Sequence, residues 1–236
     1  MRSELDALQG LRTGHVEIAT VSGVTTDLLP GVLEQLRERY PRVTVGVTSL
    51  GSQAIPDAVT SGQADIGVAF ALPRTADLQQ LGVGHFRLGA IVAPGHPLAE
   101  RRDVSFATCA EYPLILAKSD LSIHHLLAPL LARTRPRHKA PLETSSVELA
   151  LQMAKRGAGV AFQTRIGIEA ELANGTLVHV PLNDGGSVFS DLGVYVRSSR
   201  YLPVAVDAFV RALSEEIAIR EAAQGTSSSR TAPQQR

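Results

Sequence analysis

VEIATVSGVTTDLLPGVLEQLRERYPRVTVGV, residues 16–47, is the stretch that decides the fold. Apolar residues alternate at period two near both of its ends and recur at helical spacing in between, so it predicts a strand, a turn, a helix and a strand. Parallel strands need a crossover through such a helix, so we expect an α/β sheet with helices on its faces. The hydroxyl-rich turn at residues 21–27 follows the first strand at its carboxyl end, where ligands bind in open parallel sheets.

Further strands and helices follow along the chain. The apolar run at residues 65–69 predicts a strand buried on both faces, and residues 86–92 predict another strand that Pro94 ends. Residues 52–61 predict a helix that Ser52 caps. Further strands are predicted at residues 112–117, 160–162 and 192–196. Further helices are predicted at residues 124–133, from residue 144 onward and from Pro203 onward. Ser145 has the spacing of a capping-box serine for the helix that starts at residue 144.

Four segments carry a resemblance to a known family. They are LLPGVLEQLRERYPRVTVGV (28–47), SGQADIGVA (61–69), VAPGHPLAE (92–100) and AKRGAGVAF (154–162). In this order and at this spacing they resemble the effector-binding domain of LysR-type transcriptional regulators, and the resemblance covers roughly residues 14–218. It implies a two-lobed α/β fold similar to type 2 periplasmic solute-binding proteins, with two chain crossings at a hinge and a small molecule bound between the lobes.

The resemblance also divides the chain. No helix-turn-helix precedes Met1, so we expect DNA to be contacted only through a missing N-terminal helix-turn-helix domain. The C-terminal segment has no apolar residue larger than alanine or proline and is expected to be disordered. The predicted parts are residues 1–13 as the end of a linker helix, residues 14–91 and 193–222 as lobe I, residues 92–192 as lobe II, and residues 223–236 as a disordered tail.

Composition excludes several classes of protein. Lysine plus arginine and aspartate plus glutamate both number 23, whereas a domain that binds DNA by itself carries a basic excess. The single cysteine, Cys109, excludes an internal disulfide, and we expect a small buried hydrophobe there rather than a reactive thiol. Because the chain has neither a signal-peptide segment at its start nor a run of ~18 apolar residues, we expect a cytoplasmic protein with no membrane contact.

Motifs of catalysis and cofactor binding are missing from the sequence. There is no phosphate loop, dinucleotide-binding turn, nucleophile elbow, HExxH or CxxC pair. The adjacent His124 and His125 point about 100 degrees apart on a helix and cannot easily share one metal. We therefore expect no catalytic residues, no metal and no cofactor, and we interpret the chain as a binding domain and not as an enzyme.

The candidate site consists of helix N-termini that the topology brings to one cleft. Their N–H groups and hydroxyls favour anions, although plain capping explains any single serine as well. The resemblance places Ser22 and Ser145 at positions that contact effector in the family, one from each lobe. Phe70 adds an apolar wall that suits a short carbon skeleton. Together, the anion-favouring helix N-termini and this wall predict a small organic acid as the effector. The candidate residues are Ser22, Gly23, Thr25, Ser52, Phe70, Phe86, Ser119, Ser145, Phe162 and Arg165, of which Arg165 is the arginine to check first.

Two questions about partners follow from the resemblance. It implies a homodimer or tetramer in which lobes of neighbouring subunits lie antiparallel, through apolar outer faces of the helices at residues 28–40 and 124–133. The alternative function is a solute-binding protein of a transport system with the same fold. An in-frame helix-turn-helix upstream of Met1 would support the regulator, and a signal peptide there would support the transporter.

Overall fold

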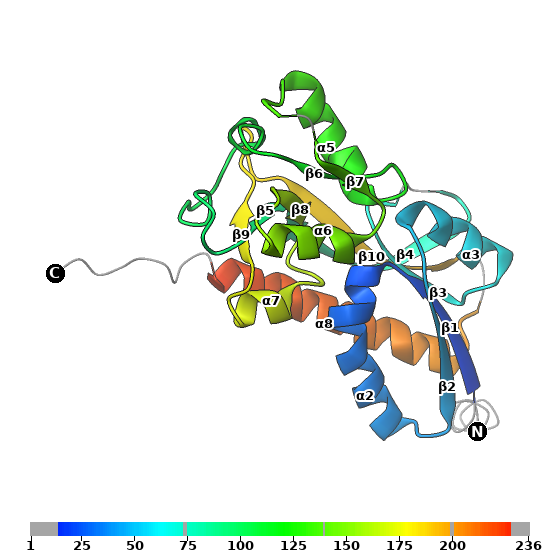
Figure 1. Cartoon of the computed structure of the whole chain (residues 1–236). Coiled ribbons are helices and arrows are strands. Elements are labelled where there is room, and N and C mark those ends of the chain that lie inside the picture. Colours follow the sequence, from blue (N-terminus) through cyan, green and yellow to red (C-terminus); the bar gives the residue numbers. More distant parts are fainter. Residues whose placement is uncertain (1–13, 73–74, 139, 199–200, 228–236) are drawn as a thin grey trace, which may run out of the picture.

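The structure is a computed structural model that describes residues 14–72, 75–138, 140–198 and 201–227. Its strands form a five-stranded sheet and, in the other part of the molecule, a three-stranded and a two-stranded sheet that one β-bridge joins. Helices α2 and α5 lie at opposite ends of the molecule (Figure 1). The fold is mixed α/β, as the sequence predicts. Among the described helices, including the 24-residue α8, none is both long and apolar enough to cross a membrane.

The first sheet contains the predicted βαβ unit. Strands β1 (Gly14–Thr20) and β2 (Val43–Ser49) pair in parallel over seven positions, from Gly14 opposite Val43 to Thr20 opposite Ser49. A single π-helical turn, η1 (Val24–Leu28), and helix α2 (Leu29–Arg39) connect them. The sheet order is β2-β1-β3-β10-β4, in which β3 (Ile66–Phe70) is parallel to β1 while β10 (Phe189–Arg197) is antiparallel to both β3 and β4 (Leu78–Arg87).

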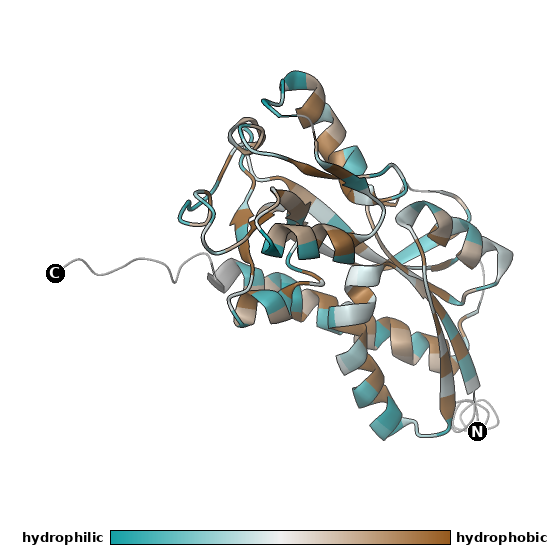
Figure 2. Ribbon diagram, in the orientation of Figure 1, coloured by the Kyte–Doolittle hydropathy of each residue, from teal (hydrophilic) through white to brown (hydrophobic). Residues whose placement is uncertain are grey.

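Helices cover both faces of this sheet. The 3₁₀ turn η2 (Ser52–Ala54) and helix α3 (Ile55–Ser61) lie on one face, where a side chain at Gly67 would meet Ile55 and Val59. Helices α2 and α8 (Val204–Ser227) pack together on the other face, where a side chain at Gly84 would meet Ile217. Figure 2 shows both hydrophobic and hydrophilic residues on α2 and α8, as expected for helices with one buried face.

The second sheet repeats this order with shorter strands. Strand β5 (Gly89–Val92) lies antiparallel between β8 (Ala161–Gln163) and β9 (Val178–Pro181), and β6 (Ile115–Ala117) is parallel to β7 (Leu142–Thr144). A parallel bridge between Leu114 and Val160 joins the two groups, so the order becomes β7-β6-β8-β5-β9. The helices of this part are α4 (Phe106–Cys109), α5 (Ser122–Arg133), α6 (Val147–Lys155) and α7 (Glu169–Ala173).

The chain crosses between the sheets twice, and the two crossings touch. Leu88, between β4 and β5, donates its N–H to the carbonyl oxygen of Val188, just before β10, at 2.8 Å. We propose that the two lobes divide at these residues. The first lobe is then residues 14–87 and 189–227, and the second lobe is residues 89–187. The sequence-based boundaries at residues 91 and 192 fall inside β5 and β10, which belong wholly to one sheet each.

Two predicted elements need correction. Strand β4 begins at Leu78, eight residues before the predicted strand at residues 86–92, and that stretch is divided between β4 and β5. Helix α8 continues to Ser227, so the predicted disordered tail is wrong for residues 223–227. The side chain of Gln224 accepts a hydrogen bond from Arg87 N–H and donates one to the carbonyl oxygen of His85, which fixes this part of the helix on β4. The predicted linker helix at residues 1–13 lies outside the described residues.

The predicted apolar outer faces are found on only one of the two helices. Val32 and Leu36 of α2 point into the core, and its exposed residues include Glu34 and Gln35. The prediction of an apolar outer face is therefore wrong for α2. Helix α5 does expose small apolar residues, such as Ala128. The predicted assembly itself stays a prediction.

Candidate functional site

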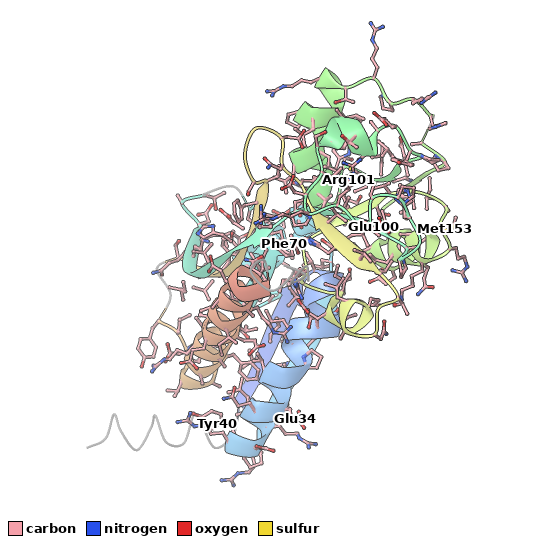
Figure 3. All side chains as sticks on the ribbon, turned by 90° about the vertical axis from the view of Figure 1, so that its left-hand side faces the viewer. Glu34, Tyr40, Phe70, Glu100, Arg101 and Met153 are labelled. Atoms are coloured by element: carbon pink, nitrogen blue, oxygen red, sulfur yellow. The ribbon has the colours of Figure 1, made fainter. Side chains whose placement is uncertain are left out.

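A cavity of about 310 Å³ lies between the two lobes. The N-terminal ends of four elements meet there: η1 and η2 from the first lobe, and α5 and α6 from the second. The carboxyl ends of β3 and β8 complete the wall with Phe70 and Gln163. Phe70 lies in the middle of the molecule, where the lobes meet (Figure 3). The topology therefore produces the cleft that the first strand-turn-helix unit predicts.

The first lobe contributes small residues and hydroxyls to the cavity. Ser22 and Gly23 lie at the start of η1, and Ser52 lies in the first turn of η2. Ser52 is buried but does not cap the helix, because η2 begins after Gly51 and has no side-chain cap. The hydroxyl of Ser22 makes no hydrogen bond within the described residues. It is therefore available to a ligand.

The second lobe presents three serines to the same cavity. Ser122 begins α5, and Ser145 and Ser146 precede α6. The predicted capping role of Ser145 is wrong, because Ser146 Oγ accepts the hydrogen bond from Leu149 N–H at 3.1 Å. The cap lies one residue later than predicted, so the hydroxyl that caps the helix belongs to Ser146 and not to Ser145. The hydroxyl of Ser145 thus remains without a partner among the described residues, like that of Ser22.

Gln163 is a cavity residue that the sequence did not reveal. Its side chain is only 5% exposed, and its Oε1 accepts a hydrogen bond from the Thr164 N–H at 3.0 Å. Since a backbone N–H can only donate, this bond fixes which end of the amide is oxygen. The Nε2 group has no partner among the described residues and is free to donate into the cavity. Its signal in the sequence was its place at the carboxyl end of a strand, the same argument that selects Phe70.

The charged groups of the cavity are both carboxylates. Asp120 lies just before α5, and Glu148 lies in the first turn of α6. One oxygen of Glu148, Oε2, accepts a hydrogen bond from the Ser146 hydroxyl at 3.0 Å. Among the described residues that line the cavity there is no lysine or arginine. Positive potential can therefore come only from backbone N–H groups and helix dipoles.

Half of the predicted site residues line the cavity, and the other half lie elsewhere. Ser22, Gly23, Ser52, Phe70 and Ser145 line it. Thr25 instead donates its hydroxyl hydrogen bond to the carbonyl oxygen of Ser22 at 2.6 Å, and Ser119 lies in a separate groove beside α5. Phe86 is buried behind Phe70, with the two ring centroids 6.5 Å apart. Phe162 packs on Phe106 in the second lobe. Arg165 donates two hydrogen bonds, of 2.8 and 3.0 Å, to the carboxylate of Glu169.

The lobes contact each other on both sides of the cavity. At the mouth, the side chains of Gln53 and His125 lie 3.2 Å apart. At the back, Gly167 donates its N–H to Asp27 Oδ2 at 3.0 Å, and the neighbouring Ile166 is buried in the core of the first lobe. Asp27 is also bound by Arg220 of α8 at 2.8 Å. These contacts join the two lobes around a cavity that remains partly open to solvent.

Two side chains of the second lobe have strongly shifted pKa values. Burial raises the pKa of the Cys109 thiol to about 12, and the charge of Asp184 adds to the effect. The thiol is neutral and inert at neutral pH, as predicted. Burial, followed by the positive charge of Arg165, lowers the pKa of His179 to about 4. Within the described residues, no group of three or more histidine, cysteine, aspartate or glutamate side chains could hold a metal ion.

The sequence of the chain matches a known protein family and its members. The model of the LysR substrate binding domain family matches residues 9–218. An uncharacterized HTH-type transcriptional regulator of Bacillus subtilis, YwbI, is 27% identical over 157 residues, which cover 66% of this chain and 52% of YwbI. The chain thus spans about half the length of this relative.

Solved structures share the fold. The effector-binding domain of QuiR in complex with shikimate superposes with a TM-score of 0.71 at 15% identity, covering 86% of this chain and 96% of QuiR's. The Synechocystis PCC6803 CcmR regulatory domain in complex with 2-PG gives a TM-score of 0.75 at 19% identity, covering 86% of this chain and 97% of CcmR's. These likenesses establish the fold.

Proposed function

Because the chain belongs to the LysR substrate-binding domain family, we propose that it senses a small organic acid held in the cavity between its lobes. The observation that carries this proposal is the pair of unbonded hydroxyls, Ser22 from the first lobe and Ser145 from the second, on one cavity. Helix N-termini beside them favour an anionic group. The ring of Phe70 supplies an apolar wall for the carbon skeleton.

In this proposal, the sensing domain belongs to a larger transcriptional regulator. In it, an N-terminal helix-turn-helix domain binds DNA in the cytoplasm, and the chain assembles as a homodimer or tetramer. The name of YwbI and the family match favour this regulator over the transport alternative. Effector binding changes the angle between the lobes, and it can shift that equilibrium only by its difference in affinity for the two states.

A thermal-shift screen of organic acids, amino acids and neutral metabolites tests the proposal. A ligand at about 100 times its Kd stabilises the folded protein by about 2.7 kcal/mol, which raises Tm measurably. We expect acids to raise Tm in the wild type and to raise it much less in a double variant, Ser22→Ala with Ser145→Ala. Stabilisation by neutral compounds alone, or equal stabilisation of the double variant by acids, would contradict the proposal.

A further inference from the structure

The charge distribution of the cavity restricts the kind of acid that it can accept. Asp120 and Glu148 both line it, and among its described lining residues no lysine or arginine offsets their two negative charges. Asp120 lies at the contact between the lobes, since a methyl group added at Gly51 of the first lobe would lie 3.1 Å from its carbonyl oxygen. Glu148 has one oxygen bound to the Ser146 hydroxyl and a second oxygen, Oε1, with no hydrogen bond among the described residues. Both residues are exposed and line the cavity, so their carboxylates can accept hydrogen bonds from a ligand.

Gln163 supplies an independent indication that a ligand belongs here. Gln163 is only 5% exposed, so its Nε2 group has little contact with water, and a donor with no protein partner among the described residues gains from an acceptor on a ligand. Its Oε1 is occupied by the Thr164 N–H, so only its Nε2 group is open to the cavity. An acceptor atom of a ligand, such as a carboxylate oxygen, completes this site.

Donors and acceptors in the cavity therefore come from different groups. The donors are Gln163 Nε2, the hydroxyls of Ser22 and Ser145, and the helix N-termini, which together suit one carboxylate. The acceptors are the carboxylates of Asp120 and Glu148, which suit hydroxyl or ammonium groups and repel a second anion. Phe70 leaves room for a short apolar part between them.

We propose that the effector is a monocarboxylic acid that carries hydroxyl or ammonium donors on the rest of its skeleton, and that Asp120 and Glu148 reject dianions. This inference rests on the proposed function, because it specifies the class of acid. The cavity of about 310 Å³ is at the lower end of small-molecule sites, which span roughly 300–1,000 Å³, so the acid is small.

Sets of acids that share a carbon skeleton but differ in the number of carboxylates test the inference. Affinities are measured by calorimetry at pH 7.5 and constant ionic strength for 4-hydroxybutyrate, 4-aminobutyrate and succinate, and for the ring pair 3-hydroxybenzoate and isophthalate. We expect the wild type to bind the donor-bearing monoacids at least about tenfold more tightly than the matching diacids, because the second carboxylate of a diacid would share the cavity with two carboxylates that no described lining lysine or arginine offsets. The double variant Asp120→Asn with Glu148→Gln should reduce this ratio to about threefold or less.

A matched control removes a negative charge elsewhere. Glu100 is exposed and does not line the cavity, so Glu100→Gln should keep the wild-type ratio (Figure 3). Equal or tighter binding of the diacids by the wild type, or a ratio that the double variant leaves unchanged, overturns the inference and leaves the proposed function standing. If none of these acids binds the wild type, the proposed function fails and the inference fails with it.

Discussion

The two lobes have the same strand order and very different strands. The first sheet, β2-β1-β3-β10-β4, pairs β1 with β2 over seven positions. The second, β7-β6-β8-β5-β9, pairs β6 with β7 over only three and is joined by a single bridge at Leu114 and Val160. In each sheet the fourth strand, β10 or β5, is the one that follows a crossing from the other lobe. Strand order, and not strand length, therefore places the helix N-termini at the cavity.

Equivalent positions of the two lobes carry different chemistry. Phe70 ends β3 in the first lobe, and Gln163 ends β8 in the second, and both line the cavity. The two carboxylates, Asp120 and Glu148, come from the second lobe alone. Both lobes supply hydroxyls and apolar residues to the described lining, and the second lobe alone adds charged groups. A shared topology fixes where a ligand sits, and side chains at matching positions decide which ligand it is.

The largest expected effect tests whether the short-stranded lobe is packed as tightly as the other. Phe86 in the first lobe and Phe106 in the second are both fully buried. Replacing either by alanine should lower the free energy of unfolding by about 3–5 kcal/mol, because each substitution leaves a cavity. Urea unfolding of the two variants measures this, with Phe189→Ala, at a site that is 46% exposed, as a control of small effect. A loss below about 1 kcal/mol for Phe106→Ala alone would mean that the second lobe is loosely packed.

The periodic parts of the fold were predictable from sequence. The unit that contains β1, α2 and β2 has strong period-two and helical patterns, and the structure confirms it. The beginning of β4 was missed because this edge strand has polar Gln79 and Gln80 and the glycines at 82 and 84, which are typical of a loop. Those glycines are required by the close packing of α8, which is a contact between distant residues.

The candidate site was predictable only in part, for related reasons. Ser22 and Phe70 follow strands directly, so the position of ligands in parallel sheets identifies them. Gln163 also follows a predicted strand, at residues 160–162, but its availability depends on a hydrogen bond from Thr164 that appears only in the fold. The cap of α6 at Ser146 depends on backbone geometry that differs by one residue from the predicted capping box. Arg165 was a candidate cation for the ligand, but Glu169 one helical turn later already binds it.

The next prediction concerns acid, to which one histidine of each lobe should respond in opposite directions. In the second lobe the folded-state pKa of His179 lies at about 4, below its ordinary value of 6.5, because of burial. Its contribution to stability is present above pH 6.5 and is lost as the pH falls toward 4, by about 2 kcal/mol between pH 7 and pH 5. In the first lobe the hydrogen bond to Asp191 raises the pKa of the exposed His85, so its small contribution is present at low pH and is lost as the pH rises through the raised value.

Urea unfolding at pH 7 and at pH 5 measures this difference. The variant His179→Phe keeps a ring of similar size against Gly89 but cannot titrate. Its loss of stability between the two pH values should be smaller than that of the wild type by about 2 kcal/mol. The matched variant His85→Phe should retain the wild-type acid sensitivity. An unchanged pH dependence in His179→Phe would show that the buried ring is not the source.

The smallest expected effect separates a serine that holds a helix from one that awaits a ligand. Ser146 caps α6 through its bond from Leu149 N–H, so Ser146→Ala should lower the free energy of unfolding by about 1 kcal/mol. Ser22 lies at the start of η1 in the first lobe, and its hydroxyl makes no bond within the described residues, so Ser22→Ala should change stability by less than about 0.5 kcal/mol. Urea unfolding without ligand measures both values. Calorimetry with the tightest acid of the screen should then show weaker binding for Ser22→Ala, since that hydroxyl has only the ligand to bind. A loss of stability in Ser22→Ala as large as in Ser146→Ala, with affinity unchanged, would assign Ser22 to the fold and remove the first lobe's hydroxyl from the site.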